Sequence, residues 1–387
     1  MKKTLIAVAA LAAVGAASAQ SSVTLYGVAD VYAGQTKTTL TLPGMRPMDV
    51  HRMSVAKQGL PMRTIVTKNT GFKSGGLQGS RIGVKGVEDL GNGLKAVFNY
   101  EMGFDAIDGS LSANPGEGVG FGRRAVVGLQ GGFGSVLLGR DYTPLYNLLA
   151  ASSVDGLSSF ETVSPLMYTP RADGVHYAGN FGGVGVQAFA GYNKESTTES
   201  DMWGSDTETI KNQSYGLGVS YANGPFMVGV AGQESKLSGS DTAPPRSGQL
   251  KRTEAAVGAT YDFGAAKLFA NYINTRVRAT INGNALGKLK GEEANIGVRV
   301  PFGAASVMAG YGHNRVKLYD GAGTQLGKAK GNDWVVGANY AFSKRTDVYA
   351  RVGRSDDLKA KATINGREFD VGSYKTENVA VGPRHKF

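Results

Sequence analysis

The sequence predicts an all-β protein, a 16-stranded antiparallel transmembrane β-barrel with long extracellular loops and short periplasmic turns. Three observations predict this fold. The chain begins with an export signal, its segments of about ten residues alternate apolar and polar side chains, and it ends on a phenylalanine that finishes such a segment. A closed sheet that follows an export signal indicates a protein of the Gram-negative outer membrane.

The export signal is the first of these observations. Two lysines precede an apolar run over residues 5–17, and a cleavage pattern of small residues follows at 17–19. The run is shorter than the ~20 apolar residues that a membrane-spanning helix needs. We therefore expect residues 1–19 to be a removable signal peptide and residues 20–387 to form one barrel domain.

The alternation of side chains is the second observation. Tyr215, Leu217 and Val219 share one face of a predicted strand, while serine and glycine occupy the other face. Barrel strands of ~9–11 residues show this pattern because one face meets lipid and the other meets the lumen. A soluble, exported sandwich would instead bury one strand face in a dry core, whereas the second face here is rich in glycine, serine, asparagine, lysine and arginine.

The strand count follows from the connections. Seven tight turns are predicted at 89–93, 131–134, 181–185, 223–225, 262–264, 301–303 and 342–345. Eight longer polar stretches lie between them, at 34–79, 105–122, 142–173, 194–212, 236–250, 277–291, 316–331 and 356–374. These connections join sixteen strands and put both termini on the short-turn side. A barrel of this size encloses an aqueous channel.

Composition narrows the function classes. The chain has no cysteine and four histidines, which leaves little material for a metal cluster, and we expect neither a metal nor a cofactor. It has no Gly-x-Ser-x-Gly motif and no paired acid–base constellation, so an enzyme is not expected. The net charge is +11, but the basic residues are spread along the alternating strands, so we expect no nucleic-acid partner.

Four blocks of sequence resemble a known family. The strings over 20–27, 80–91, 123–140 and 382–387 are similar, in this order, to the trimeric general diffusion porins of Gram-negative β-proteobacteria. The resemblance covers essentially the whole chain after the signal. It implies a homotrimer in which each barrel allows passive diffusion of small hydrophilic solutes and anions.

The resemblance also implies roles for two parts of the chain. The third long loop, 142–173, would fold into the lumen as the constriction. The terminal Phe387 would be the signal that the barrel-assembly machinery reads. Lipopolysaccharide and other outer-membrane lipids would surround the barrel.

Charged side chains of the lumen are the candidate selectivity residues, because a constriction sets a local field with such groups. The basic candidates are Arg81, Lys85, Arg123, Arg124, Arg140 and Arg171. The acidic candidates are Asp141, at the base of loop three, and Asp155 and Glu161 within it, as a counterweight. Arg123 and Arg124 have opposite parity, so only one of them should face the lumen. An arginine here could also hold loop three in place.

The predicted function is therefore a water-filled channel for small hydrophilic solutes and ions, with a mild preference for anions. The alternative is a substrate-specific anion channel, for phosphate or an organic acid. A dedicated channel would stack basic residues at several heights along the lumen, whereas the candidates above are consistent with a single zone.

Overall fold

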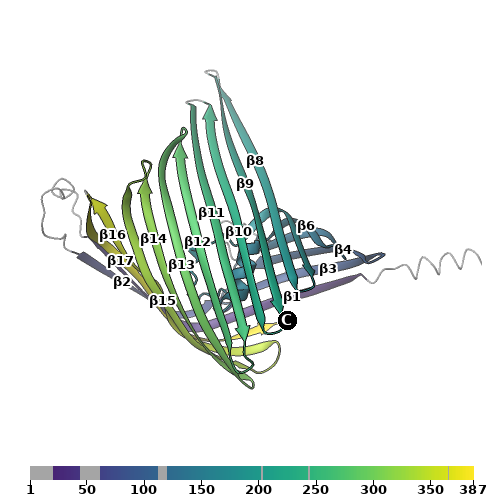
Figure 1. Cartoon of the computed structure of the whole chain (residues 1–387). Helices are drawn as coiled ribbons and strands as arrows, with labels where there is room; N and C mark the ends of the chain where they lie inside the picture. Colours follow the sequence, from purple (N-terminus) through teal and green to yellow (C-terminus); the bar gives the residue numbers. More distant parts are fainter. Residues whose placement is uncertain (1–20, 44–61, 112–119, 202–203, 243–244, 365) are drawn as a thin grey trace, which may run out of the picture.

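The sheet closes where its last strand, β17 (Arg367–Lys386), pairs with its first, β1 (Ser22–Pro43) (Figure 1). The structure is a computed structural model that describes residues 21–43, 62–111, 120–201, 204–242, 245–364 and 366–387. The predicted signal peptide lies outside the described residues. Within them, no helix is long and apolar enough to cross a membrane.

The chain ends inside this closing seam. The amide of Phe387 donates to the carbonyl of Gly27 at 3.1 Å, and the amide of Gly27 donates back at 3.0 Å. The ring of Phe387 then covers Gly27 so closely that a Cβ there would come within 2.3 Å of it. A glycine at this position of β1 therefore makes room for the terminal ring.

Seventeen strands form the antiparallel sheet, and sixteen of them build the barrel. The extra strand is β2 (Met62–Ser74), which pairs with the upper part of β1, while β3 (Arg81–Gly91) pairs with its lower part, Ser22–Val28. The polar stretch 34–79 was expected to be a single loop. Its β-branched and alternating residues instead continue β1 and return as a hairpin.

The barrel wall has a low side and a high side (Figure 1). The low side consists of strands of 8–11 residues: β3, β4 (Leu94–Gly103), β5 (Arg124–Gly131), β6 (Gly134–Tyr142) and β7 (Arg171–Phe181). The high side consists of strands of 15–20 residues: β8 (Val184–Asp201), β9 (Gly204–Asn223), β10 (Phe226–Thr242), β11 (Pro245–Asp262), β12 (Lys267–Ile281), β13 (Asn284–Phe302), β14 (Ala305–Asp320), β15 (Gln325–Ala341), β16 (Thr346–Ile364) and β17.

All seven predicted tight turns are confirmed, since each joins two consecutive barrel strands at one end. Most of the long loops predicted on the high side are hairpins instead, because the strands continue into these segments. At the tip of β12–β13 only Asn282 and Gly283 remain unpaired, both with positive φ (50° and 77°), as a two-residue hairpin turn requires. The polar residues before such tips still form cross-strand pairs, for example the hydroxyls of Thr198 and Thr207 at 2.9 Å.

The two faces of the wall have the chemistry that the alternation predicted. On the outside of β9, Tyr215 and Leu217 are more than half exposed. On the inside, buried polar residues such as Glu293 and Asp333 alternate with buried apolar ones. The buried apolar clusters lie in the lumen, where the loop after β6 packs against the inner wall.

Candidate pore constriction

Loop three, residues 143–170, leaves β6, enters the lumen and returns to β7. It begins with helix α2 (Pro144–Ser152), whose first turn is capped by Thr143. The Thr143 hydroxyl accepts the amide of Tyr146 at 3.2 Å and donates to the carbonyl of Thr169 at 2.9 Å. One side chain therefore starts the helix and ties the two ends of the loop together.

Apolar side chains of loop three cover the inner face of the high wall. Leu145 and Leu149 of α2 are fully buried and pack with Ile273 of β12. Farther along, Phe160 packs among Tyr32 of β1 and Tyr349 of β16, with its ring centroid 5.4 Å from that of Tyr32. The loop thus follows the inner wall from β9 round to β1.

Asp155 anchors the middle of loop three. Arg351 of β16 donates two parallel hydrogen bonds to this carboxylate, from Nε to Oδ2 at 2.8 Å and from Nη2 to Oδ1 at 2.7 Å. Both side chains are almost completely buried, at 3% and 1% exposed. Arg299 of β13 lies 3.9 Å from the same carboxylate and donates to the carbonyl of Val154. Asp155 therefore faces the wall rather than the open channel.

Glu161 is also turned away from the channel. Its carboxylate accepts the amide of Asp155 at 2.7 Å and the amide of Thr162 at 2.9 Å. Burial raises the pKa of Glu161, while these backbone hydrogen bonds act in the opposite direction and the nearby Asp155 adds to the rise. Glu161 thus holds the fold of the loop. The expected acidic counterweight to the pore arginines is not on the open side of loop three.

Two further carboxylates of the high wall hold the returning half of the loop. Glu293 of β13 accepts the amide of Ser164 at 3.1 Å, and Glu254 of β11 accepts the Thr169 hydroxyl at 3.1 Å. Glu254 is also paired with Arg252 at 2.5 Å. These contacts leave the loop few alternative positions in the lumen.

The low wall opposite the loop carries a basic cluster around one carboxylate. Arg81 of β3 and Arg123 both contact Glu101 of β4, at 3.3 and 2.8 Å. The hydroxyl of Tyr26 on β1 donates to the same carboxylate at 3.1 Å, and the ammonium of Lys85 lies 5.4 Å from the centre of the Tyr26 ring. Arg81 and Lys85 share the inward face of β3, as expected.

Arg171 joins the cluster through an aromatic stack. Its guanidinium lies 4.7 Å from the centre of the Tyr142 ring, which stacks on Tyr146 of α2 at 4.6 Å. The Tyr142 hydroxyl accepts hydrogen bonds from both Arg171 and Arg123, at 3.2 and 3.1 Å. Burial raises the pKa of Tyr146, whereas Arg171, Arg123 and Arg81 lower it, so all three guanidinium groups act on the base of the loop.

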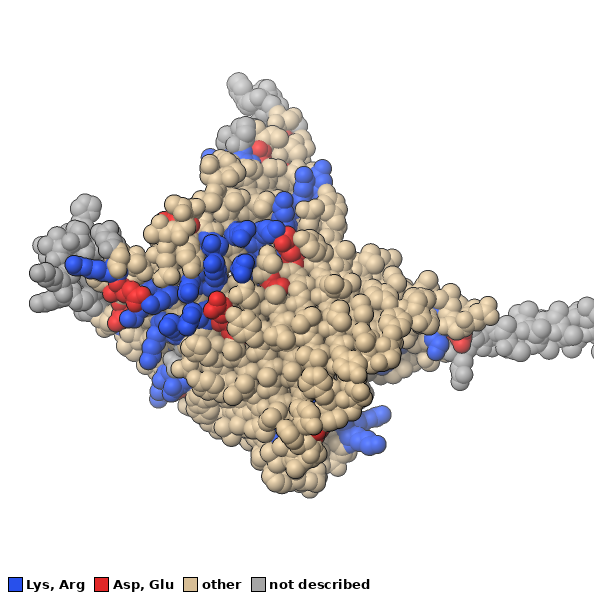
Figure 2. Space-filling model, in the orientation of Figure 1, with Lys and Arg blue, Asp and Glu red and all other residues tan. Residues whose placement is uncertain are grey.

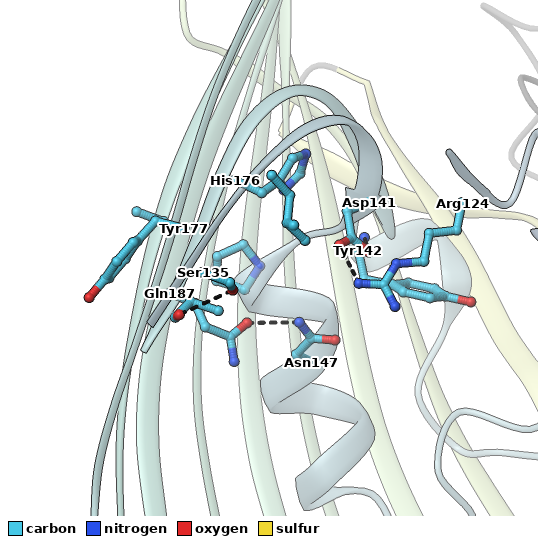
Figure 3. A pocket seen from close by; sticks show the side chains of 12 residues that line it. Arg124, Ser135, Asp141, Tyr142, Asn147, His176, Tyr177 and Gln187 are labelled. Atoms are coloured by element: carbon cyan, nitrogen blue, oxygen red, sulfur yellow. Dashed lines mark hydrogen bonds and ion pairs between the residues drawn. The ribbon is translucent and has the colours of Figure 1, made fainter. Parts of the chain in front are cut away.

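Arg124 and Asp141 lie beside this cluster, in a cavity of about 220 Å³ between the low wall and α2 (Figure 3). They form an ion pair at 2.7 Å, and Asn147 of α2 donates to Gln187 of β8 at 2.7 Å across the same cavity. Arg124 has the inward parity of β5. Arg123 precedes the strand and bends back onto Glu101, so both arginines reach the inside. The parity argument was wrong here because it applies only within a strand.

Arg140 is not where the sequence placed it. It shares the face of β6 with Val136 and Leu138, which are exposed on the outside of the barrel. Its guanidinium pairs with Asp173 of β7 at 2.9 Å and donates to the carbonyl of Gly122 at 2.7 Å. Asp141, the next residue, has the inward side chain. Arg140 therefore lies at the rim of the low wall, where it and Asp173 line a cavity of about 500 Å³ together with Arg171 and Glu254.

Sequence reasoning missed three residues of the site: Glu101, Arg299 and Arg351. Each sits at an inward position of an alternating strand, which is a signal that the sequence contains. The signal is weak, because many polar side chains face the lumen of a barrel. Only the position of Asp155 against β16 distinguishes Arg351 from the rest.

A first prediction concerns the cap. Thr143→Ala should lower the free energy of unfolding by about 1–2 kcal/mol, because a helix cap is lost and the carbonyl of Thr169 keeps only the hydrogen bond from Gln233. Urea titration of the protein refolded in lipid vesicles measures this. Thr143→Ser keeps the hydroxyl and is the control. Equal stability of the alanine and serine variants would contradict the prediction.

The barrel and its luminal loop define the class of protein, a channel-forming barrel of the outer membrane. Residues 7–360 match the family described as Gram-negative porin, and the chain belongs to this family. It is 32% identical to outer membrane porin protein 32 of Delftia acidovorans over 298 residues, which cover 73% of this chain and 72% of the relative. It is 31% identical to an outer membrane porin protein of Bordetella pertussis over 299 residues, 71% and 70% of the two chains.

Solved structures agree on the fold. An anion-selective porin from Comamonas acidovorans superposes with a TM-score of 0.63 at 23% identity, covering 95% of this chain and 100% of that one. The trimer form of OmpT from Vibrio cholerae superposes with a TM-score of 0.58 at 17% identity, covering 95% and 99%. This protein is accordingly a porin of the Gram-negative outer membrane, a diffusion channel and not an enzyme. The long hairpins are extracellular, and the short turns face the periplasm.

Proposed function

We propose that this porin prefers anions among the small hydrophilic solutes that diffuse through it. One observation carries the proposal: Asp155 and Glu161 of loop three are buried, whereas Arg81 and Arg124 of the low wall stay partly exposed on its inner face. Arg81 and Arg123 share a single carboxylate, Glu101, and Arg171 lies beside them on the ring of Tyr142. An excess of positive charge at the narrowest part lowers the energy of a passing anion.

The field of this cluster should be strong at physiological salt. Arginine keeps its charge at any working pH. Charges in a cleft with low-dielectric walls focus the field, while salt screens it over ~8–10 Å. The similar porin from Comamonas acidovorans is named anion-selective, which supports the same assignment for this chain.

Planar-bilayer recordings of the purified protein test the proposal. In a tenfold KCl gradient, the zero-current potential should have the sign of chloride permeation, and its magnitude should fall as the salt is raised because screening increases. A potential of zero, or one with the sign of potassium permeation, would contradict anion preference while leaving the channel itself intact.

A substrate-specific anion channel is the second candidate. Its support is the vertical spread of the basic residues, since Lys85 lies four residues from Arg81 and therefore ~13 Å along the strand. In that case phosphate or a carboxylate at micromolar concentration should block the chloride current, and the conductance should saturate. A current that rises in proportion to salt and ignores phosphate favours the general porin.

We also propose a homotrimer whose contacts lie on the low wall. The outward side chains of its short strands include the exposed Val127, Leu129 and Leu138, an apolar surface that a neighbouring barrel would cover. The chain is similar to a protein solved in a trimer form. Mass measurement of the detergent-extracted protein before and after heating would distinguish trimer from monomer.

Two further proposals concern biogenesis. Residues 1–19 are removed on export, which N-terminal sequencing of the mature protein would test. Phe387 serves as the recognition element for the barrel-assembly machinery, and its place in the closing seam supports this role. Deleting Phe387 should slow assembly in cells more than refolding of the purified chain.

A further inference from the structure

A short segment between β2 and β3 turns into the lumen. It consists of residues 75–80, which form neither helix nor strand, and we call it the inner turn. Its Leu77 is buried in the same apolar cluster as Val154 and Phe160 of loop three. Leu77 and Gln78 also line a cavity of about 410 Å³, together with inward side chains of β12–β17 and part of loop three. The inner turn therefore lies beside loop three inside the barrel.

The carboxylate of Asp30, on β1, holds the middle of the inner turn. Its Oδ2 accepts the amides of Leu77 and Gln78, at 2.8 and 2.7 Å. Its Oδ1 accepts the hydroxyl of Tyr349, on β16, at 2.6 Å. Hydrogen bonds to an ionised acceptor are stronger than those between neutral groups. The carboxylate thus ties the inner turn to β1 and β16, on either side of the closing strand β17.

The backbone of Asp30 closes both ends of the inner turn. Its carbonyl accepts the amide of Gly75 at 2.8 Å and the hydroxyl of Ser80 at 3.1 Å. The amide of Asp30 donates to the Ser80 hydroxyl at 3.1 Å, and the hydroxyl of Ser74, the last residue of β2, donates to it at 2.9 Å. A single residue of β1 therefore determines the path of the whole segment.

The Asp30 side chain is completely buried, at 0% exposed. The charges of the outer surface gather above a broad band without them (Figure 2), and Asp30 takes no part in that surface. Among the described residues, no cationic group forms an ion pair with it. A buried carboxylate without an ion pair is costly, and it is tolerated where hydrogen bonds satisfy it. Two of its three donors belong to the inner turn, so the carboxylate is satisfied only while this segment stays in the lumen.

The inner turn contacts loop three directly. The amide of Ser159 donates to the carbonyl of Gly76 at 3.0 Å, and the hydroxyl of Ser159 donates to the carbonyl of Gly75 at 2.8 Å. Gly76 has no room for a side chain, since a Cβ would lie 2.0 Å from the Tyr349 hydroxyl. The part of loop three that follows Asp155 is therefore fixed to the inner turn as well as to the high wall.

The other side of the inner turn contacts the basic cluster of the low wall. Arg81 donates from Nη1 to the carbonyl of Gly79 at 3.1 Å. Arg123 packs so close to Gly79 that a Cβ there would lie 3.0 Å from its Nη1. Both arginines also contact Glu101, so the inner turn and this carboxylate together determine where the two guanidinium groups lie. One segment thus connects loop three with the basic cluster.

We propose that the inner turn is a second element of the constriction and that Asp30 is its positioning residue. The carboxylate contacts no solute, because it is buried, and it acts through the segment that it holds. In its place, the inner turn narrows the lumen beside loop three and keeps Arg81 and Arg123 toward the path of the ions. Its effect on channel width is independent of the anion preference, whereas its effect on selectivity rests on the proposed function.

Asp30→Leu tests this role. It removes the acceptor of two backbone amides, so the inner turn should leave the lumen. The single-channel conductance should then rise and become noisier. The chloride-to-potassium permeability ratio should fall about twofold, which Coulomb's law gives in screened water when two guanidinium groups move from ~6 to ~8 Å from the ion path. Planar-bilayer recordings of the refolded full-length protein in a KCl gradient measure both quantities.

Asp30→Asn is the matched control. It loses the same charge, but its side-chain oxygen still accepts the two amides and its NH2 group donates to the Tyr349 oxygen. Its conductance should stay at the wild-type level, and its permeability ratio should not fall. The sign of the change is diagnostic, because removing a negative charge by itself raises the ratio. A fall in Asp30→Leu alone therefore indicates lost positioning rather than lost charge.

Gly76→Ala displaces the inner turn without any change of charge. The new Cβ meets the Tyr349 hydroxyl, so the segment has to shift, and the conductance should rise and the permeability ratio fall as in Asp30→Leu. Gly71→Ala, on β2, is its control and should behave as the wild type, since a Cβ there meets nothing within 4 Å. The two displacing variants change different elements, so either one tests the proposal if the other does not fold.

Wild-type conductance in both Asp30→Leu and Gly76→Ala would overturn the second constriction element. A higher conductance with an unchanged or raised permeability ratio would overturn the positioning of the two arginines. Equal effects of Asp30→Leu and Asp30→Asn would also overturn it, by assigning the change to the buried charge. A zero-current potential of zero in the wild type would contradict the anion preference alone, since the conductance still tests the inner turn.

Discussion

Arg351→Met should free the middle of loop three and lower the free energy of unfolding by about 3–5 kcal/mol, the usual cost of leaving a buried charge without its partner. Asp155 would keep the hydrogen bond from the Ser158 hydroxyl at 2.8 Å and, among the described cationic groups, the distant Arg299 at 3.9 Å. The guanidinium of Arg351 also donates to two backbone carbonyls and to Asn339, so its loss affects the wall as well. Because the loop narrows the lumen, the single-channel conductance should rise and become noisier.

Two controls separate the buried charge from the loss of an arginine. Arg354→Met, on the same strand, removes an ion pair with Glu377 that is about one third exposed, and should cost at most ~1 kcal/mol. Asp155→Leu/Arg351→Met replaces both buried charges by apolar groups and should recover most of the lost stability. Urea titration and bilayer recordings measure both effects. Wild-type stability and conductance in Arg351→Met would show that Asp155 does not anchor the loop.

Much of the fold follows from local pattern. Period-two alternation defined the strands, and glycine-rich turns defined the short-turn end, because both depend on neighbouring residues alone. The hairpins above the membrane were not predicted, since polar segments such as 194–212 resemble loops in composition. Whether such a segment pairs depends on a partner strand that the preceding strands have already positioned. The hairpin of β1 and β2 was missed for the same reason.

The site was predictable only in part. Arg81 and Lys85 could be placed inside by strand parity. Asp155 and Glu161 could not be placed, because an irregular loop has no periodicity and its carboxylates turn toward whatever donors the wall offers. Those donors, Arg351 and the amides of the loop itself, are brought to the carboxylates by the fold rather than by a sequence pattern. The prediction that Arg140 faces the lumen did not follow strand parity, because Arg140 occurs one residue before the inward-facing Asp141.

The charge of Arg81 should control ion selectivity. Arg81→Glu exchanges a positive for a negative charge beside Glu101 and should reduce the chloride-to-potassium permeability ratio by about tenfold. A unit charge ~6 Å from an ion changes its energy by about 0.7 kcal/mol in water, and salt roughly halves this. Two charge units, acting in opposite directions on the two ions, then give ~1.4 kcal/mol. The zero-current potential in a KCl gradient measures the ratio.

The outer rim offers the matched control for this substitution. Arg140→Glu makes the same change of charge on the same wall, but at its rim and beside Asp173 rather than beside Glu101, so its effect on the ratio should be smaller. Glu101→Gln should act in the opposite direction to Arg81→Glu, because it removes the carboxylate that partly neutralises Arg81 and Arg123. A higher anion preference in Glu101→Gln together with a lower one in Arg81→Glu would locate the selectivity at this cluster. Equal effects of Arg81→Glu and Arg140→Glu would instead mean that ions respond to the overall charge of the barrel, and that the burial of Asp155 and Glu161 is irrelevant to permeation.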